Sequence, residues 1–254
     1  MVNASDKITY KLFVDAGIKK GMKVIDIGSG RGDVSLLLAD MVGVEGSVLG
    51  LDFDESALAY ARERVQENKL TNVTFIKSNL SELSINPGKF DAIVGRRVLM
   101  YLPDPKKVIS DLSVLLKDGG MMIFQEHDST MSPGSVVPMP LHDKVNKWIW
   151  DTVEHEGGNI HLGFELWNIL SQNDLVVEKI RAEAVVQTPD KPYPMAPIVK
   201  AMMPRIIGTG VATEAEIDIS TLEHRLDQER KKSNSTYIRE MVFCAWARSS
   251  KVNE

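Results

Sequence analysis

Short apolar runs alternate with amphipathic stretches through the first half of the chain. The apolar runs are rich in valine, isoleucine and leucine, and the amphipathic stretches space their apolar residues along one helix face. The predicted strands are residues 22–28, 47–52, 72–77, 90–95 and 121–126, with the first two helices at 33–42 and 55–68. Near-continuous hydrophobic strands separated by helices are typical of a parallel sheet covered on both faces, so the pattern predicts an α/β fold.

A further helix is predicted after the fourth strand. Asp104 can cap its first turn, and Pro105 suits the first helical position, where a missing amide proton has no partner to lose. We expect the Asp-Gly-Gly sequence at 118–120 to end this helix before the fifth strand begins.

The regular alternation stops near residue 127. We expect one domain over residues 1–254, interrupted by insertions at about 127–160 and 187–235 that would close over the strand ends as a lid. Within the first insertion, Leu141, Val145, Trp148 and Thr152 share a helical face, and in the second Thr213 and Glu216 have capping-box spacing. The remaining core elements are predicted as a helix at 164–173 and strands at 175–186 and 240–248.

A glycine-rich turn follows the first strand. Its glycines are Gly28, Gly30 and Gly32, but the sixth position of a dinucleotide fingerprint, normally glycine, is Asp33. A carboxylate is unfavourable where a helix amino end should receive a pyrophosphate. With Asp26 on the other side, the turn favours a cation, and S-adenosylmethionine carries both an adenosine and a cationic sulfonium.

The end of the second predicted strand supplies a nucleoside-binding pair. Asp52 can accept hydrogen bonds from both ribose hydroxyls, and Phe53 can lie against the adenine ring. Asp54 is better placed than Asp52 to cap the following helix. We therefore predict that Asp52 binds ribose.

Taken in order, these segments resemble the class I S-adenosylmethionine-dependent methyltransferases, and most closely the ubiquinone and menaquinone group. The resemblance covers roughly residues 20–130, through "VIDIGSGRGD", "VLGLDFDESALAYAR", "VTFIKSNLSEL", "FDAIVGRRVLMYLPDP" and "LLKDGGMMIFQE". It implies a Rossmann-like seven-stranded methyltransferase sheet with helices on both faces and an antiparallel last strand.

The same resemblance implies further cofactor contacts. Asn79 and Leu80 would approach the adenine edge, and Gly95 and Arg96 would lie beside the methionine portion. Asn79 stands where this class usually has aspartate, but its amide oxygen can still accept a hydrogen bond from the adenine amino group. The cofactor-binding residues expected are Asp26, Gly28, Ser29, Gly30, Gly32, Asp52, Phe53, Asn79, Leu80, Gly95 and Arg96.

The composition limits the kinds of binding partner and the cellular compartment that we expect for this protein. The net charge of −5 gives no basic face for nucleic acid, and no segment approaches the roughly 18 apolar residues of a membrane helix. The N-terminus lacks an export pattern, and the single cysteine cannot form an internal disulfide. We expect a cytoplasmic protein with a small-molecule partner, without nucleic-acid or membrane partners, and with a homodimer as the oligomer to test.

The methyl acceptor is expected to be a small, ring-containing metabolite, methylated on nitrogen or oxygen. The fourth strand is followed by Gly95-Arg96-Arg97 and not by the proline-rich signature of the amino-group methyltransferases of DNA bases. Methionines in the insertions offer adaptable apolar surface for such a substrate, or they pack in the core; they are Met131, Met139, Met195, Met202 and Met203.

Three polar residues end the fifth predicted strand: Glu126, His127 and Asp128. His127 and Asp128 are the candidate catalytic residues, because a base is needed when the acceptor starts protonated. Each also has a structural reading: Glu126 can accept backbone amides, His127 can be an ordinary loop histidine, and Asp128 can cap a turn. We expect no metal site here, since these three do not form a convincing ligand set.

Further candidate residues and two alternative functions also fit the sequence. His142, His155 and His161 could reach the same cavity as His127, and Cys244 reads as a small buried hydrophobe. An NAD-dependent oxidoreductase would share the sheet and the ribose acid, and a non-methylating S-adenosylmethionine-binding protein would share every motif.

Overall fold

The computed structural model describes residues 4–82, 88–131, 133–172 and 174–250. Two predicted segments end outside this range. They are the stretch "VTFIKSNLSEL", which ends at residue 83, and the helix predicted at 164–173, which ends at residue 173. The chain forms two compact units. The sheet unit comprises Met1–Glu126, Phe164–Arg181 and Phe243–Glu254, and the helical unit comprises His127–Gly163 and Ala182–Val242.

A seven-stranded sheet organises the fold, in the order β3-β2-β1-β4-β5-β7-β6. The first five strands are β1 (Lys23–Ile27), β2 (Ser47–Asp52), β3 (Val73–Lys77), β4 (Phe90–Arg96) and β5 (Leu116–Asp128). Their pairing is parallel, as the hydrophobic runs predicted. Consecutive residues of β1 are buried, so both faces of the sheet are covered at this strand.

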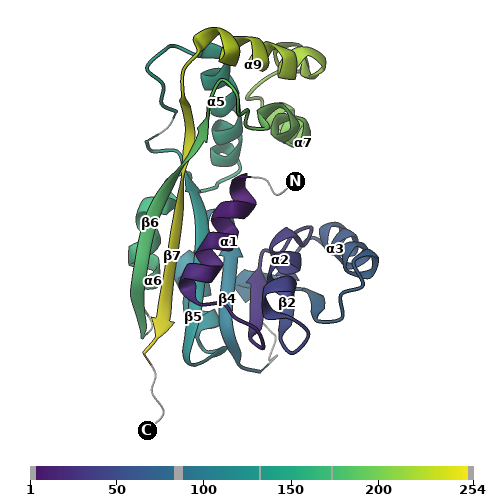
Figure 1. Cartoon of the computed structure of the whole chain (residues 1–254), viewed down its shortest axis with the longest axis vertical. Coiled ribbons are helices and arrows are strands. Elements are labelled where there is room, and N and C mark those ends of the chain that lie inside the picture. The colour runs from purple at the N-terminus through teal and green to yellow at the C-terminus, as the bar shows by residue number, and fades with distance from the viewer. Residues whose placement is uncertain (1–3, 83–87, 132, 173, 251–254) are drawn as a thin grey trace. The chain divides into compact units, whose positions relative to one another are not determined.

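The last two strands complete the sheet in the expected way. They are β6 (Leu175–Gln187) and β7 (Tyr237–Ser249), which lie side by side along the edge beyond β5 (Figure 1). The sheet is mixed, with antiparallel last strands, and the prediction from the resemblance is confirmed.

The order in which the parallel strands are added reverses at the middle of the sheet. β1 has β2 on one side and β4 on the other, with Ile27 in register with both Leu51 and Gly95. In an open sheet such a switch point leaves a crevice beyond the carboxyl ends of the two central strands. This topology places the glycine turn, Asp52 and Gly95 together at the carboxyl ends of the central strands.

Helices of the sheet unit connect these strands. They are α1 (Ala4–Ala16), α2 (Asp33–Val42), α3 (Glu55–Glu67), α4 (Pro105–Ser113) and most of α6 (Leu162–Leu170), with short 3-10 turns η1 (Leu80–Glu82) and η2 (Leu99–Tyr101). The cap predicted for α4 is confirmed, because the Asp104 side chain accepts a hydrogen bond from the Lys107 amide. Asp54 likewise caps α3.

The helical unit is built on α5 (Pro140–His155), α7 (Met195–Gly208) and α9 (Ile219–Ser233), which pack on one another (Figure 1). A short helix, α8 (Glu214–Ile217), carries the predicted capping box between Thr213 and Glu216. Asp218 adopts a left-handed conformation and separates α8 from α9. None of the helices among the described residues has the length and apolar character needed to cross a bilayer.

Two sequence-based boundaries were wrong. α4 ends at Ser113, so Asp118-Gly119-Gly120 do not terminate it; they lie inside β5, next to the register shift between Phe90 and Ala92. A glycine pair in a strand is typical of such an irregularity. β5 also continues past Glu126 to Asp128.

Two helices were not predicted. α1 buries Thr9, Leu12, Phe13 and Ala16, whose spacing is helical but includes a threonine. α7 begins after Pro194 and contains Pro204, and such proline content reads as loop. Both helices are held by tertiary packing of their apolar faces.

Candidate functional site

The glycine turn after β1 needs glycine for two separate reasons. Gly28 has φ +63°, and a Cβ there would lie 2.5 Å from Val98 Cγ2. Gly30 has φ +50°, with open space where its Cβ would be. Gly28 therefore serves packing, while Gly30 leaves backbone accessible for close approach by a ligand. Ser29 is buried, and its Oγ has no partner within the part of the chain that the structure describes.

Asp52 holds this turn in place from the end of β2. Its Oδ2 accepts a hydrogen bond from the Gly30 amide at 2.7 Å, and its Oδ1 accepts one from the Asp54 amide at 2.9 Å. Each carboxylate oxygen keeps a second lone pair, which can accept a ribose hydroxyl. The geometry fits the predicted role and adds a second one, which is to fix the loop.

The predicted adenine contacts differ in exposure. Phe53 follows Asp52 and is 74% exposed, so one ring face is open to a planar ligand. Asn79 is exposed, and its Oδ1 accepts a hydrogen bond from the Ser81 amide at 3.1 Å. Leu80 is buried at the start of η1. Phe53 and Asn79 are therefore accessible, whereas Leu80 is not, and the adenine contacts of all three stay predictions.

The two acids around the turn carry less free charge than the sequence indicates. Asp26 is buried and accepts a hydrogen bond from Ser35 Oγ at 2.5 Å, and burial raises its pKa to about 7. Asp33 Oδ1 lies 2.6 Å from Arg64 Nη1. Because one acid is partly protonated near neutrality and the other is paired, the electrostatic preference for a cation is weaker than predicted.

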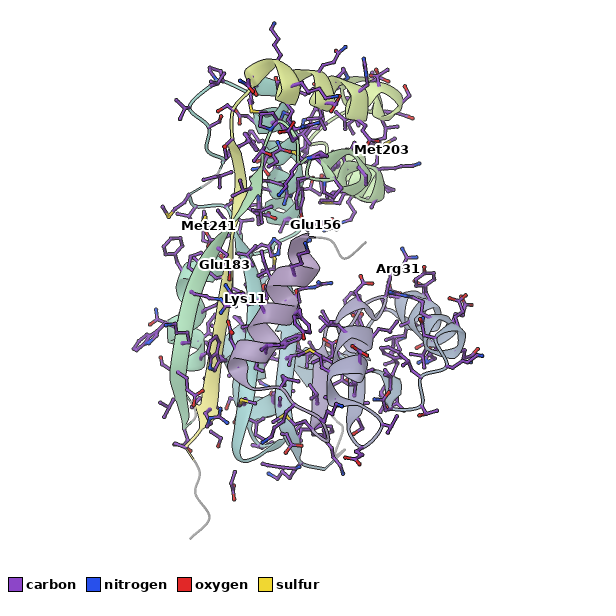
Figure 2. The ribbon with its side chains drawn as sticks, in the orientation of Figure 1. Lys11, Arg31, Glu156, Glu183, Met203 and Met241 are labelled. Carbon is purple, nitrogen blue, oxygen red and sulfur yellow. The ribbon has the colours of Figure 1, made fainter. Side chains whose placement is uncertain are left out.

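Arg31 lies inside the turn but is directed toward α3. Its guanidinium carbon lies 3.8 Å from the centre of the Tyr60 ring, and its exposed position is labelled in Figure 2. Such a cation–π contact stabilises the loop from its outer side.

Gly95 and Arg96 come from the end of β4. A Cβ on Gly95 would lie 2.6 Å from Val98 Cγ1, so Val98 packs against both Gly95 and Gly28. Arg96 Nη1 donates to Thr9 Oγ1 at 3.3 Å, and Arg96 Nη2 lies 3.9 Å from Asp33 Oδ2. The arginine therefore lies near Asp33, at the end of the turn.

Thr9 and Val98 are site-supporting residues that sequence reasoning missed. Thr9 Oγ1 donates to Gln125 Oε1 at 2.7 Å, which ties α1 to β5 beside Arg96. A helical pattern across residues 4–16 was the available signal for Thr9. No local signal marks Val98, because its importance comes largely from packing against Gly28, which is distant in sequence.

Glu126 is a structural acceptor, which confirms one of the readings proposed for it. Its Oε1 accepts hydrogen bonds from the Val98 amide at 3.0 Å and the Leu99 amide at 2.9 Å. Burial raises the pKa of this carboxyl to about 7. Glu126 therefore fixes the segment whose Val98 side chain packs on Gly28 and Gly95.

His127 and Asp128 belong to the helical unit. His127 is 3% exposed, and its Nδ1 lies 2.9 Å from Glu240 Oε1, which also accepts from Arg239. Asp128 Oδ1 accepts from the Thr130 amide at 2.8 Å and so closes a turn. His127 and Asp128 thus have structural partners, and their catalytic roles stay predictions.

The other histidines of this region have separate surroundings. His142 is buried and bonded to Glu229 at 2.7 Å, His155 Nδ1 donates to the Asp151 carbonyl at 2.7 Å, and His161 Nδ1 lies 2.7 Å from Thr130 Oγ1. Within the described residues, no group of three His, Cys, Asp or Glu side chains is arranged to hold a metal ion.

The insertion methionines divide by burial. Met139, Met195 and Met202 are buried and pack in the core, whereas Met131 is 66% exposed. Met203 is half-buried on α7 and is labelled in Figure 2. Cys244 is buried in β7, as expected.

Known proteins resemble this chain in sequence and in fold. A family model described as a methyltransferase domain matches residues 18–184. A demethylmenaquinone methyltransferase from Listeria welshimeri is 35% identical over 117 residues, which cover 46% of this chain and 50% of that protein. The chain thus spans about half the length of the curated relatives it matches.

Two solved structures share the fold at low identity. Phosphoethanolamine N-methyltransferase 2 from Haemonchus contortus, solved with S-adenosyl-L-methionine, has a TM-score of 0.62 at 17% identity, covering 98% of this chain and 53% of that chain. A SAM-dependent methyltransferase from Aquifex aeolicus has a TM-score of 0.54 at 22% identity, covering 70% of this chain and 83% of that chain.

Proposed function

The chain belongs to the methyltransferase-domain family, and we propose that it transfers a methyl group to a nitrogen or oxygen atom of a small, ring-containing metabolite. S-adenosylmethionine is its cofactor and supplies a methyl carbon activated by a positively charged sulfur. The observation that carries the proposal is the hydrogen bond from the Gly30 amide to Asp52, which joins an open glycine turn to the acid that we propose binds ribose.

Different residues at the carboxyl ends of the strands would contact different parts of the cofactor. Gly28, Ser29, Gly30 and Gly32, with Asp26 beneath them, would hold the methionine end together with Gly95 and Arg96. Asp52 would accept the ribose hydroxyls, and the exposed Phe53 ring would lie against adenine beside Asn79 and Leu80. The buried Ser29 Oγ, which has no partner among the described residues, is a further hydroxyl in this turn that we propose the cofactor engages.

Methyl transfer is an in-line displacement, so the main contribution of the protein is to hold the reactants close and aligned. The fixed backbone around Gly28, Val98 and Gly95 supports that alignment. A proton acceptor is needed only when the acceptor atom starts protonated, and we propose His127 and Asp128 for that role.

The acceptor class rests on several indirect observations. The relatives' names describe small-molecule acceptors, a demethylmenaquinone and a phosphoethanolamine. The acidic net charge of −5 also disfavours nucleic acid. The family match favours methyl transfer over the NAD-dependent alternative.

We assign acceptor selection to the helical unit. This unit comprises His127–Gly163 and Ala182–Val242; the family model, which ends at residue 184, covers the first of these segments but only the start of the second. The part of the chain that departs from the family is where a substrate preference would be encoded.

Titration calorimetry tests the cofactor proposal directly. S-adenosylmethionine and its demethylated product should both bind, and no heat with either at high micromolar concentrations would exclude the proposed function. Incubation with methyl-labelled cofactor and metabolite extracts then identifies the acceptor. Binding without any labelled product would indicate the non-methylating alternative.

A further inference from the structure

The helical unit contains a cavity of about 570 Å³. This volume lies within the range of about 300–1,000 Å³ that small-molecule sites occupy. Its wall comes from α5, the end of β6, the segment leading into α7, and α9. The lining includes His142, Gln187, Tyr193, Met195, Asp227 and Arg230.

Gln187 lines the cavity and carries a buried side-chain amide whose NH₂ group is not paired with any described residue. The residue is 2% exposed, and its Oε1 accepts a hydrogen bond from the Tyr193 amide at 3.2 Å. Because that partner donates, the other amide atom is the NH₂ group. This Nε2 has no partner among the described residues. A buried donor without an acceptor costs free energy, which a ligand oxygen would recover.

The wall beside Gln187 is held in a fixed shape. Thr188 and Lys191 exchange two backbone hydrogen bonds of 3.1 Å, which close the turn after β6. The Tyr193 ring lies 5.0 Å from the Arg239 guanidinium carbon. With Pro192, Pro194 and Met195, this ring offers a preformed apolar surface suited to a flat ring system.

The charges of the wall disfavour an anion. Arg230 is buried and pairs with Asp227, and it also donates to the Thr188 carbonyl at 3.2 Å. This leaves the carboxylate of Glu223 as a further negative charge on the wall. A carboxylate ligand would therefore meet more negative than positive charge.

His142 adds no positive charge to the wall. Its Nδ1 lies 2.7 Å from Glu229 Oε2, whose carboxylate also accepts the Leu141 and His142 amides at the start of α5. Burial lowers the pKa of His142, so the ring is neutral near pH 7. The Glu229 carboxylate requires the Nδ1–H form, which leaves Nε2 as an acceptor.

We propose that this cavity binds a neutral, ring-containing small molecule whose carbonyl oxygen accepts a hydrogen bond from Gln187 Nε2. The ring system would lie against Tyr193, Met195 and the two prolines. The proposal uses only observations from the helical unit. Its test therefore does not depend on whether the chain transfers a methyl group.

Flavanone and flavan test the carbonyl requirement, because the two neutral ring compounds differ in that group. Titration of the full chain, followed by ligand-observed NMR, should give a dissociation constant about tenfold lower for flavanone than for flavan. The anion 2-naphthoate should bind more weakly than flavanone. Equal affinities for flavanone and flavan, or no flavanone binding up to its solubility limit, would overturn the proposal.

Substitutions of Gln187 locate the site. Gln187→Leu removes the donor, and Gln187→Glu keeps the acceptor for the Tyr193 amide while replacing the NH₂ group with a carboxylate oxygen. Both should lose the tenfold preference for flavanone. Gln66→Leu, at an exposed position of α3 in the sheet unit, is the matched control and should keep it. Circular dichroism verifies that each variant is folded, and an unchanged preference in folded Gln187→Glu would contradict the assignment.

Discussion

Asp52 Oδ2 accepts a hydrogen bond from the Gly30 amide at 2.7 Å, so the end of β2 fixes the turn after β1. The two residues are 22 positions apart and meet because their strands are parallel neighbours. One carboxylate therefore both shapes the glycine turn and leaves lone pairs for a ribose. The cofactor proposal depends on this double role.

Asp52→Ala should weaken S-adenosylmethionine binding by about 1–3 kcal/mol, through loss of hydrogen bonds to a charged group. Titration calorimetry measures the change. Asp54→Ala is the matched control, since Asp54 caps α3 through the Ser56 and Ala57 amides. It should lower the free energy of unfolding by about 0.5–2 kcal/mol and leave the affinity unchanged. Unaltered affinity in Asp52→Ala would remove the ribose assignment.

Gly28→Ala should destabilise the protein more than Gly30→Ala. Both glycines have left-handed φ angles, which cost a residue with a Cβ about 1–2 kcal/mol. Only at Gly28 would the new Cβ also clash, 2.5 Å from Val98 Cγ2, and overpacking adds about 1–3 kcal/mol. Urea unfolding measures both variants. The additional substitution Val98→Ala should recover part of the Gly28→Ala loss, and equal effects at the two glycines would show that Val98 is not the obstacle.

Glu126→Gln should change the pH dependence of stability. Burial raises the folded-state pKa of Glu126 from 4.5 to about 7, so its contribution is fully present below pH 4.5 and is lost as the pH rises toward 7. Relative to the variant, the free energy of unfolding of the wild type should fall by up to about 3 kcal/mol across this interval. Above it, the difference between the two proteins should change little. Urea unfolding at several pH values gives the difference. Asp26 titrates in the same range in both proteins and cancels. A pH-independent difference would contradict the raised pKa.

His127→Gln and Asp128→Asn test the proposed catalytic roles. Loss of a general base should lower kcat by about 100-fold or more while the affinity for the cofactor is kept. His155→Gln is the control, because this exposed histidine of the same unit bonds the Asp151 carbonyl of its own helix. A normal kcat in both folded variants would assign His127 and Asp128 to structure, through Glu240 and the Thr130 turn.

Local sequence features were predicted best. The helix over Asp33–Val42 and the strand over Ser47–Asp52 have the predicted bounds, and the caps at Asp104 and Thr213 were recognised. Each depends on residues within one or two turns of each other. The end of α4 was placed wrongly because Asp-Gly-Gly stops a helix in isolation, whereas here it lies within a strand that pairs with β4.

The sequence by itself determined the parallel sheet, the glycine turn and the acid after β2, because periodicity and backbone constraints act over a few neighbouring residues. Only the tertiary structure decided that Val98 packs on Gly28, that Arg64 pairs with Asp33, and that Gln187 and Arg230 line the same cavity. These relationships join residues far apart in the chain. Burial and packing set their distances, charges and pKa values, and no short stretch of sequence carries that information.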